Sequence, residues 1–387
     1  MMSFDILLII LQYRKMLKIG ITGQAGFVGT HLYNTLGLYS EEFERVPFEK
    51  DFFSNQQLLE QFVTQCDVIV HLAAMNRHND PQVIFDVNIE LAQKLVDALE
   101  STKSRAHVIF SSSTQEERDN EYGKSKKAGR ELLYNWSIKS GGKFTGLIIP
   151  NVFGPFGHPN YNSVIATFCH QLTHHETPSI AVDGELKLIY VGELVEVLIS
   201  EIRGAKSQAE KVVPHTATAK VSQILSLLEK YKSEYQEKGI IPSIATTFEL
   251  NLFNTFRCYM DIKNHFPVSF VEHTDDRGSF VEIIRLGVGG QVSFSTTVPG
   301  ITRGNHYHTR KIERFAVIKG KALIQLRRIG TDEVLDFYLD GENPSYVDMP
   351  IWYTHNIKNI GDEVLYTNFW INEFYDPNDP DTYFENV

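Results

Sequence analysis

The hydrophobic pattern of this chain changes once along its length, and the change divides it into two regions that must fold differently. From residue 17 to residue 150, short apolar runs alternate with longer stretches of helical period. From residue 278 onward, short β-type runs are separated by turns, with no helix-length amphipathic stretch between them. The first region predicts an α/β fold, a doubly wound parallel sheet with helices on both faces. The second predicts an all-β barrel or sandwich.

Run length and period predict the individual elements. Strands of the first region are expected at residues 17–21, 68–71, 106–110 and 145–149, with another near 44–46. Helices are expected near residues 27–36, 56–64, 83–100, 124–139 and 221–238, and residues 253–267 are expected to be an irregular junction. The β runs of the second region are 279–285, 291–297, 315–319, 321–327, 334–339 and 364–370.

The chain has 387 residues, enough for two or three domains. We expect a parallel-sheet domain over residues 16–256 and an all-β domain over residues 257–387. Residues 1–15 include an apolar run, but it contains Asp5 and is far shorter than the ~20 residues of a membrane-spanning helix. It also lacks the flanks of a signal peptide. We interpret residues 1–15 as a disordered tail or a mis-assigned start.

Charge and cysteine content exclude some classes of function. A formal net charge of −11 and the absence of any Lys/Arg run argue against a nucleic-acid surface. The three cysteines, Cys66, Cys169 and Cys258, form no Cys-x-x-Cys pair, which predicts free thiols in a reducing compartment. We therefore expect a cytoplasmic protein that binds neither nucleic acid nor membrane.

A glycine-rich turn follows the first predicted strand. Gly23 permits the tight turn, Gly26 lets the backbone approach a pyrophosphate, and Gly29 lets the next helix lie close to the strand. The phosphates would then lie at the helix N-terminus, where unpaired N–H groups favour anions. The Gly-x-x-Gly-x-x-Gly spacing is a weak signal by itself. The residues expected to bind the cofactor here are Gly23, Gln24, Gly26, Phe27, Val28 and Gly29.

A tyrosine and a lysine strengthen that signal. Tyr122 and Lys126 lie four residues apart, so on a helix they share one face. A lysine beside a tyrosine favours the phenolate, which would make Tyr122 a proton donor or acceptor nearer neutral pH. The strand-ending run Ser111-Ser112-Ser113 lies just upstream, so a catalytic site is favoured over a solvated helix face.

Four residues of the second region have the spacing of a metal site. His306 and His308, two apart on a strand, point to the same side. Glu313 on the next strand and His355 on a later one can converge with them inside a barrel. Imidazole and carboxylate suit Zn, Fe, Ni or Mn, and we expect one divalent metal, zinc first.

With these motifs, the N-terminal two-thirds of the chain resembles an extended short-chain dehydrogenase/reductase of the nucleotide-sugar branch. The resemblance implies a Rossmann-like domain with a nicotinamide cofactor. Tyr122 follows Ser113 by only nine positions, fewer than in most relatives, so a loop that usually helps to cover the site is short. The residues that the resemblance assigns to the cofactor, to support of the site or to the reaction are His71, Leu72, Ala73, Asn88, Ser113 (or Ser112), Tyr122 and Lys126.

The segment from about residue 271 resembles a single cupin domain, and also the cupin epimerases that act on 4-keto-deoxysugar nucleotides. Residues 275–282 and 303–306 match their Asp-x-Arg-Gly-x-Phe and Arg-Gly-x-His elements. Trp352 stands where the cupin motif usually has glycine. The resemblance implies that Arg277 and Arg303 contact the substrate, through its diphosphate, and we expect Asn151 to contact it too. In those epimerases the histidine matching His306 is a base without metal, so a metal here would require another base.

Over nearly its whole length the chain resembles the bifunctional capsular-polysaccharide enzymes of the UDP-2-acetamido-2,6-dideoxy-L-talose and L-fucosamine routes. Residues 160–169 and 376–384 resemble that family outside the generic motifs. The resemblance implies a homodimer that epimerises C3 of a UDP-4-keto sugar in its cupin domain and then reduces C4. The alternatives are a reductase whose cupin is a metal-stabilised dimerisation module, and a sugar-binding cupin with an inert reductase fold, which the intact Tyr122 and Lys126 disfavour.

The choice between NADP and NAD depends on the residues after the second strand. No isolated acid follows residues 44–46 where a ribose 2′-hydroxyl would need it. Arg45 and Lys50 are available for a 2′-phosphate, whereas Glu49 and Asp51 oppose one. We expect NADP.

Overall fold

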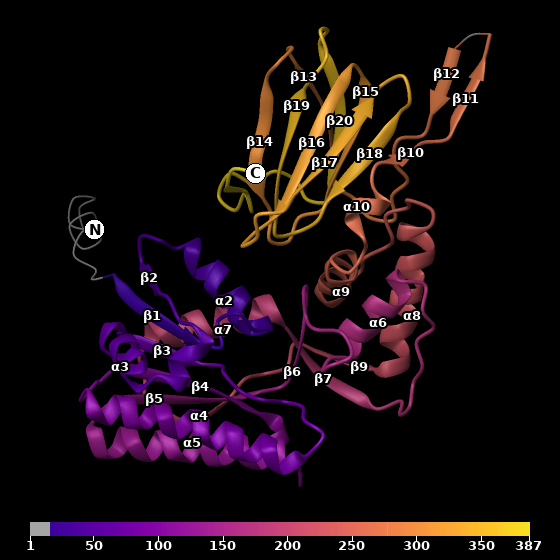
Figure 1. Cartoon of the computed structure of the whole chain (residues 1–387). Helices are drawn as coiled ribbons and strands as arrows, with labels where there is room; N and C mark the ends of the chain where they lie inside the picture. Colours follow the sequence, from indigo (N-terminus) through magenta and orange to yellow (C-terminus); the bar gives the residue numbers. More distant parts are fainter. Residues whose placement is uncertain (1–15, 277) are drawn as a thin grey trace, which may run out of the picture. The chain divides into compact units, whose positions relative to one another are not determined.

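The computed structural model describes residues 16–276 and 278–387, which form two compact units (Figure 1). The first unit contains the chain up to Phe153, with Tyr161–Ser163 and Leu186–Thr218. The second contains Gly154–Asn160, Val164–Glu185 and Ala219–Val387, so compactness groups helices from residue 219 onward with the β region. The expectation for residues 1–15 lies outside the described residues. No helix in the described ranges is long and apolar enough to span a membrane.

The first unit is built on a parallel sheet in the order β2-β1-β3-β4-β5-β8, which confirms the predicted doubly wound fold. Its strand order reverses between β1 and β3. Every residue of β3 is buried, as expected for a strand covered on both faces. The strands are β1 (Leu17–Thr22), β2 (Phe43–Val46), β3 (Val68–His71), β4 (His107–Ser113), β5 (Lys143–Ile149) and β8 (Gln208–Val212).

Helices cover both faces of this sheet. Apolar residues of α3, α4 and α5 form one core with the sheet, and those of α2 and α7 form the other. Asn55, Asp80 and Asn120 begin α3, α4 and α5 as N-caps whose side chains accept a backbone N–H. The elements are α2 (Phe27–Gly37), η1 (Lys50–Ser54), α3 (Gln56–Gln65), α4 (Pro81–Ser101), η2 (Thr114–Glu117), α5 (Glu121–Ser140), β6 (Asn151–Phe153), β7 (Glu185–Tyr190), α7 (Val191–Gly204) and β9 (Ala217–Lys220).

The second unit contains helices as well as strands. The prediction of an irregular junction over residues 253–267 was wrong, because α9 extends through Arg257 and buries Leu252, Phe253 and Phe256 on one face. The predicted helix near 221–238 is confirmed as α8 followed by a π-helical turn. The elements are α6 (Val164–Thr173), α8 (Val221–Tyr231), η3 (Lys232–Gln236), α9 (Thr247–Arg257) and α10 (Ile262–His265).

Two antiparallel sheets form the β region, which confirms the all-β prediction for the C-terminal part. Their orders are β10-β18-β15-β20-β13 and β17-β16-β19-β14-β21, and apolar residues of both contribute to one core. β11 (Glu272–Asp275) and β12 (Gly278–Val281) form a separate hairpin. The sheet strands are β10 (Val268–Ser269), β13 (Gln291–Thr297), β14 (Thr302–Tyr307), β15 (Glu313–Lys319), β16 (Lys321–Arg328), β17 (Val334–Asp340), β18 (Ser345–Met349), β19 (Tyr353–Asn359), β20 (Leu365–Ile371) and β21 (Tyr383–Phe384).

A buried ion pair joins the helices of this unit to the sheets. Arg314 of β15 and Asp348 of β18 are bonded at 2.7 and 3.0 Å, and their side chains are 3% and 0% exposed. The Tyr235 hydroxyl donates to Asp348 and the carbonyl of Gly239 accepts from Arg314, at 2.7 and 3.0 Å. Arg257 of α9 donates to the carbonyl of Met349. A buried charge pair needs such additional partners to offset its desolvation.

Candidate functional site

The glycine-rich turn connects β1 to α2 at the carboxyl edge of the parallel sheet. Gly23 has a φ of 75°, in the left-handed region that favours glycine, and a Cβ there would lie 2.8 Å from the Ala73 nitrogen. A Cβ on Gly29 would lie 2.3 Å from the Gly23 carbonyl oxygen. Gly26 is the N-cap of α2. The turn also holds Gln24, Phe27 and Val28. These close approaches at a helix N-terminus fit a pyrophosphate.

The ends of β1 and β3 are tied together beside this turn. Thr22 Oγ1 lies 2.7 Å from His71 Nδ1, and the N–H groups of Leu72 and Ala73 donate to the Thr22 carbonyl and hydroxyl. Burial, and then the charge of Lys126, lower the pKa of His71 to about 3, so its ring is neutral. The predicted cofactor residues His71, Leu72 and Ala73 lie at the end of β3, beside the point where the strand order reverses. Doubly wound sheets bind ligands at such a point.

Asn88 of α4 supports the loop after β3. Its side chain accepts from the Met75 N–H at 2.6 Å and donates to the Met75 carbonyl at 3.0 Å and to the Ser125 hydroxyl at 2.9 Å. Asn88 is buried, and it links this loop to α5.

The serine, tyrosine and lysine lie at the end of β4 and the start of α5. Lys126 Nζ is 6.0 Å from the centre of the Tyr122 ring and 3.5 Å from the Ser111 hydroxyl. Ser113 accepts a hydrogen bond from the Gln115 N–H. The alternative residue, Ser112, is buried and donates to the carboxylate of Glu116. Of the two serines, Ser112 therefore has its hydroxyl bound to a carboxylate, whereas Ser113 accepts from a backbone N–H.

The pKa values of Tyr122 and Lys126 are set by burial. Burial raises the pKa of Tyr122 to about 12, with a further contribution from Tyr161. Burial lowers the pKa of Lys126 to about 7, although Glu116 opposes the change. The direction for Tyr122 is opposite to the predicted lowering, because desolvation is the largest contribution to its pKa in this structure. Tyr122 is therefore a protonated phenol near neutral pH.

A close backbone contact explains how nine positions suffice between Ser113 and Tyr122. A Cβ on Gly123 would lie 2.0 Å from the Gln115 carbonyl oxygen, so only glycine lets α5 approach η2 this closely. Arg130 of α5 forms a buried two-bond ion pair with Glu116 of η2, at 2.9 and 2.7 Å. The sequence analysis missed Glu116, because its partner is fourteen positions away and no motif marks it.

The two cations considered for a 2′-phosphate differ in their surroundings. Arg45 of β2 lies over the Tyr33 ring, 4.3 Å from its centre, and donates to the Tyr33 carbonyl. Lys50 begins η1 and is exposed, as is Glu49 before it. Both cations are exposed, and Arg45 is already engaged with Tyr33.

In the second unit, the four predicted metal ligands come together. One ligand atom each from His306, His308, Glu313 and His355 lies within 4.8 Å of the others. Nε2 of His308 and Nε2 of His355 are 3.0 and 3.2 Å from Glu313 Oε2. The His306 side chain is 24% exposed and the other three are nearly buried. β14, the turn after it, β15 and β19 supply the four residues.

The donor set fits a divalent metal. Among the described residues, His308 Nε2, Glu313 Oε2 and His355 Nε2 are buried atoms without a hydrogen-bond partner. A shared metal would satisfy all three atoms. Burial, and then His355, lower the pKa of His306 to about 4. Burial alone would raise the pKa of Glu313, but His308 and His355 hold it below its usual range. Both groups are thus in metal-binding form near neutral pH.

A β-bulge in β14 aligns Arg303 with the histidines. Arg303 pairs with Ile357 of β19 and His306 pairs with His355, so β14 has one extra residue between them. Three positions normally reverse the face of a strand, and the bulge cancels that reversal. Because Arg303 lies opposite Ile357, a core residue, the register places Arg303 on the same side of β14 as His306, although the Arg303 side chain is exposed. Gly304, with a φ of 101°, makes the bulge possible, because a Cβ there would lie 2.8 Å from the His355 carbonyl oxygen.

Trp352 keeps the backbone conformation of the glycine that it replaces in the cupin motif. Its φ is 61°, in the left-handed region, and its N–H donates to the His308 carbonyl at 2.8 Å. The indole stacks on Tyr307, with ring centres 5.7 Å apart. A glycine would adopt this left-handed conformation without strain, whereas Trp352 adopts it with its indole stacked on Tyr307.

The predicted substrate residues Asn151, Arg277 and Arg303 do not lie on one element. Asn151 is exposed on β6, just past the carboxyl end of β5, and donates to the Lys187 carbonyl at 3.4 Å. Arg277 lies outside the described residues. Arg303 is exposed and donates to the Thr296 carbonyl. The sequence analysis missed Tyr161, whose hydroxyl accepts from the Asn76 N–H and which raises the Tyr122 pKa. The only signal for it was its place in the family-like run 160–169.

Comparisons with known proteins agree with both halves of this description. The NAD dependent epimerase/dehydratase family matches residues 19–212, and the polysaccharide biosynthesis C-terminal domain matches residues 273–383. The crystal structure of capsular polysaccharide assembling protein CapF from Staphylococcus aureus is 34% identical, with a TM-score of 0.61, over 96% of this chain and 100% of that one. The chain belongs to the CapF family of capsular polysaccharide enzymes. The resemblance inferred from the sequence is confirmed.

Two curated relatives extend the comparison. UDP-2-acetamido-2,6-beta-L-arabino-hexul-4-ose reductase of Pseudomonas aeruginosa is 32% identical over 369 residues, which are 95% of this chain and 98% of that protein. The chain is therefore a homologue of a nucleotide-sugar 4-ketoreductase. Spore coat polysaccharide biosynthesis protein SpsL of Bacillus subtilis is 28% identical over 121 residues, covering 29% of this chain and 80% of that protein.

Proposed function

We propose that this chain is a bifunctional enzyme of capsule or O-antigen sugar synthesis that acts on a UDP-4-keto-2-acetamido-2,6-dideoxyhexose. Its first unit reduces the C4 ketone with NADPH, and its cupin region epimerises C3. The observation that carries the reductase is the pairing of half-buried Tyr122 with buried Lys126 on α5, in a chain homologous over 95% of its length to a 4-ketoreductase. The cupin activity is supported by the converging ligand set and by Arg303 on the same side of β14 as His306.

In the reductase, each side chain has one task. The turn at Gly23, Gly26 and Gly29 holds the pyrophosphate of NADPH, which supplies a hydride when bound. Tyr122, a protonated phenol near neutral pH, donates its proton to the C4 oxygen, and Ser113 donates a hydrogen bond to the same oxygen. Reduction removes the ketone that makes the C3 proton acidic, and so the configuration at C3 becomes permanent.

In the cupin region, the four clustered residues hold a divalent metal, zinc by the nature of the donors. When bound, the metal would polarise an oxygen of the substrate. Arg303 and Arg277 bind the diphosphate. Because the three histidines of the cluster are ligands, the base that removes the C3 proton must be another group.

Preference for NADP is supported by the residues after β2. The first acid after β2 is Glu49, and the exposed Lys50 follows it. Titration should show tighter binding of NADPH than of NADH, and Lys50→Ala should weaken only the binding of NADPH. Equal affinity for the two cofactors in the unmodified enzyme would argue against this preference.

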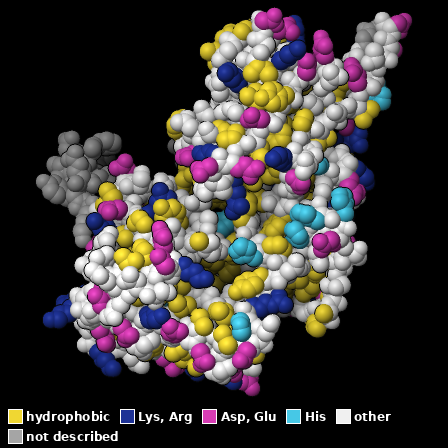
Figure 2. Space-filling view, viewed as in Figure 1, with side chains coloured by type: hydrophobic (Ala, Val, Ile, Leu, Met, Phe, Trp, Pro, Cys, Tyr) yellow, Lys and Arg dark blue, Asp and Glu magenta, His cyan; other side chains and the backbone are white. Residues whose placement is uncertain are grey.

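A homodimer is supported by unprotected β edges. β13 ends its sheet and exposes Val292 and Phe294, with Phe294 73% exposed, and the β11–β12 hairpin projects outside both sheets. Figure 2 shows hydrophobic side chains reaching the surface of the β region. Natural proteins rarely leave such edges uncovered, and a second copy would cover them. Light scattering at micromolar concentration should give the mass of a dimer.

One experiment separates the bifunctional enzyme from a reductase with a metal-stabilised dimerisation module. The purified enzyme is incubated with the 4-keto substrate in deuterated water, with and without NADPH, and the products are examined by NMR. We expect deuterium at C3 without NADPH, and a C3-inverted 4-hydroxy sugar with it. Reduction without any exchange at C3 would favour the module, and no NADPH consumption would contradict the reductase.

A further inference from the structure

The C-terminal segment of the chain crosses the strands that carry the metal-ligand set. β21 pairs with β14 at His306 and Tyr307. The Glu385 N–H donates to the Asn305 carbonyl, and the Thr354 hydroxyl donates to the Glu385 carbonyl. The segment is therefore attached to both β14 and β19, the strands of His306 and His355.

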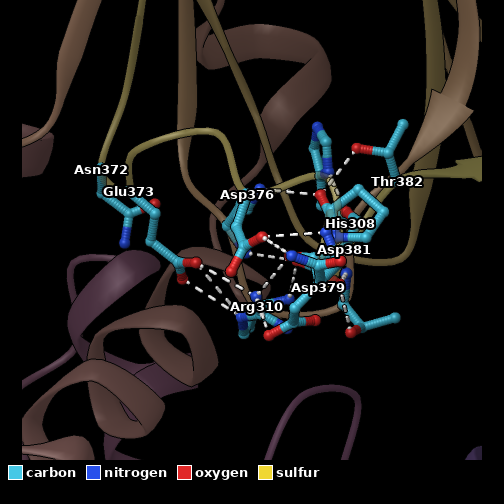
Figure 3. A network of polar contacts seen from close by, with 12 residues as sticks. His308, Arg310, Asn372, Glu373, Asp376, Asp379, Asp381 and Thr382 are labelled. Atoms are coloured by element: carbon cyan, nitrogen blue, oxygen red, sulfur yellow. Dashed lines mark hydrogen bonds and ion pairs between the residues drawn. The ribbon is translucent and has the colours of Figure 1, made fainter.

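Asp381 is the centre of this attachment (Figure 3). It is 2% exposed and has a φ of 40°, in the left-handed region. One carboxylate oxygen accepts from the N–H and hydroxyl of Thr309, at 3.0 and 2.6 Å. The other accepts from the N–H groups of Arg310 and Lys311, at 3.1 and 3.0 Å. A single carboxylate thus holds the whole turn that follows His308.

The backbone of Asp381 also determines the state of the His308 ring. Its carbonyl oxygen accepts a hydrogen bond from His308 Nδ1. Because a carbonyl can only accept, Nδ1 carries a proton, and Nε2, 3.0 Å from Glu313, is the nitrogen that faces the other ligands. Such a partner on the far nitrogen of a ligand histidine fixes its tautomer and orientation.

Charged contacts hold the same turn from further out. Arg310 forms ion pairs with Glu373 and Asp379, at 3.2 and 2.8 Å, and Lys311 Nζ donates to the Pro380 carbonyl at 2.7 Å. Figure 3 shows the contacts of Arg310 with Glu373 and Asp379. The Arg310 pairs are partly exposed, so each contributes little by itself.

His355 and His308 are oriented by different contacts. His355 Nδ1 contacts the carbonyl of Tyr353 on its own strand. His308 depends on a residue 73 positions away. We propose that Asp381 is a positioning residue for metal binding, and that the C-terminal segment is required to hold His308 in its ligand geometry. This inference rests on the metal site of the proposed function.

The test measures binding of Co²⁺ and Zn²⁺ to the full chain against a competing chelator. In Asp381→Asn, an amide NH₂ would face N–H donors, and we expect affinity to fall by about 10- to 100-fold, with a changed Co²⁺ spectrum. Asp379→Asn, which removes only an exposed partner of Arg310, should bind like the unmodified chain. Thr309→Val, which removes one of the four donors, should give a smaller loss and serves if Asp381→Asn does not fold.

A double variant distinguishes positioning from general stabilisation. If Asp381 acts through His308, then Asp381→Asn should weaken metal binding little further in a His308→Ala background. Losses that simply add would overturn the inference, as would unchanged affinity in a folded Asp381→Asn. If the unmodified chain bound neither metal, the proposed metal site would fail together with the inference. If it bound metal and Asp381→Asn bound it equally well, only the inference would fail.

Discussion

Replacing Gly29 by alanine should distort the glycine-rich turn and weaken cofactor binding at the same time. A Cβ there would lie 2.3 Å from the Gly23 carbonyl oxygen and 2.8 Å from that of Gln24, and backbone atoms cannot rotate away. Ordinary contact begins at 3.4 Å, so α2 and the turn must separate by about 1 Å (3.4 − 2.3). Overpacking of this kind costs about 1–3 kcal/mol. Binding that requires the original turn would then weaken by about 5- to 150-fold.

Titration of NADPH by fluorescence and unfolding in urea measure the two effects separately. Gly26→Ala, whose Cβ would lie 3.1 Å from the Gly23 carbonyl oxygen, should give an intermediate loss. Gly184→Ala is the control, because its Cβ would meet no atom within 4 Å, and it should change stability by less than about 0.5 kcal/mol. A folded Gly29→Ala protein with unchanged NADPH affinity would refute the close-approach argument.

Four other substitutions, one of them a control, test the first unit. Tyr122→Phe should slow reduction of the ketone by about 10²–10⁴-fold, while deuterium exchange at C3 continues. Loss of exchange in the folded variant would show that the two reactions are not independent. Glu116→Gln should lower the free energy of unfolding by about 3–5 kcal/mol in a urea titration, because it breaks a buried ion pair. Glu210→Gln, which removes a partner that is 55% exposed, should cost less than about 1 kcal/mol. Because the pKa of Lys126 falls from 10.5 to about 7 on folding, the unfolded chain binds the extra proton between these values. Stability should therefore rise with pH across that window, by up to about 1.4 kcal/mol per unit, and Lys126→Met should remove this slope.

The hydrophobic pattern of the sequence predicted those helices and strands whose buried faces are apolar. The strands β1, β3 and β5 and the helices α2 to α5 begin and end within a few residues of their predicted positions. β18 was not predicted, although every residue of β18 is buried, and β19 was expected only as the strand of His355, without bounds. Asp348 interrupts the apolar run of β18 and is tolerated there only because Arg314 pairs with it. Buried His355 and Asn356 likewise disguise β19. When the buried polar residues of a strand are satisfied by tertiary partners, its sequence does not show the apolar pattern of a strand.

Spacing along the chain predicted the ligand set, but not what orients it. His306, His308 and Glu313 lie within eight positions of one another, so their convergence follows from strand geometry. The bulge that brings Arg303 onto the same face depends on two left-handed residues, and only the register with β19 shows it. The contact between Asp381 and His308 joins residues far apart in sequence. A single sequence has no local pattern for such a pairing.

The ion pair between Arg314 and Asp348 determines where the second unit can be cut. A fragment that begins at residue 257 would lose the Tyr235 hydroxyl from Asp348 and the Gly239 carbonyl from Arg314, leaving two interior charges incompletely solvated. The sheets should therefore not be transplantable without α8 and α9, and a chimaera with another cupin would have to be joined before residue 219. Amide protons of β15, β18 and α9 should exchange together, as those of one cooperative block.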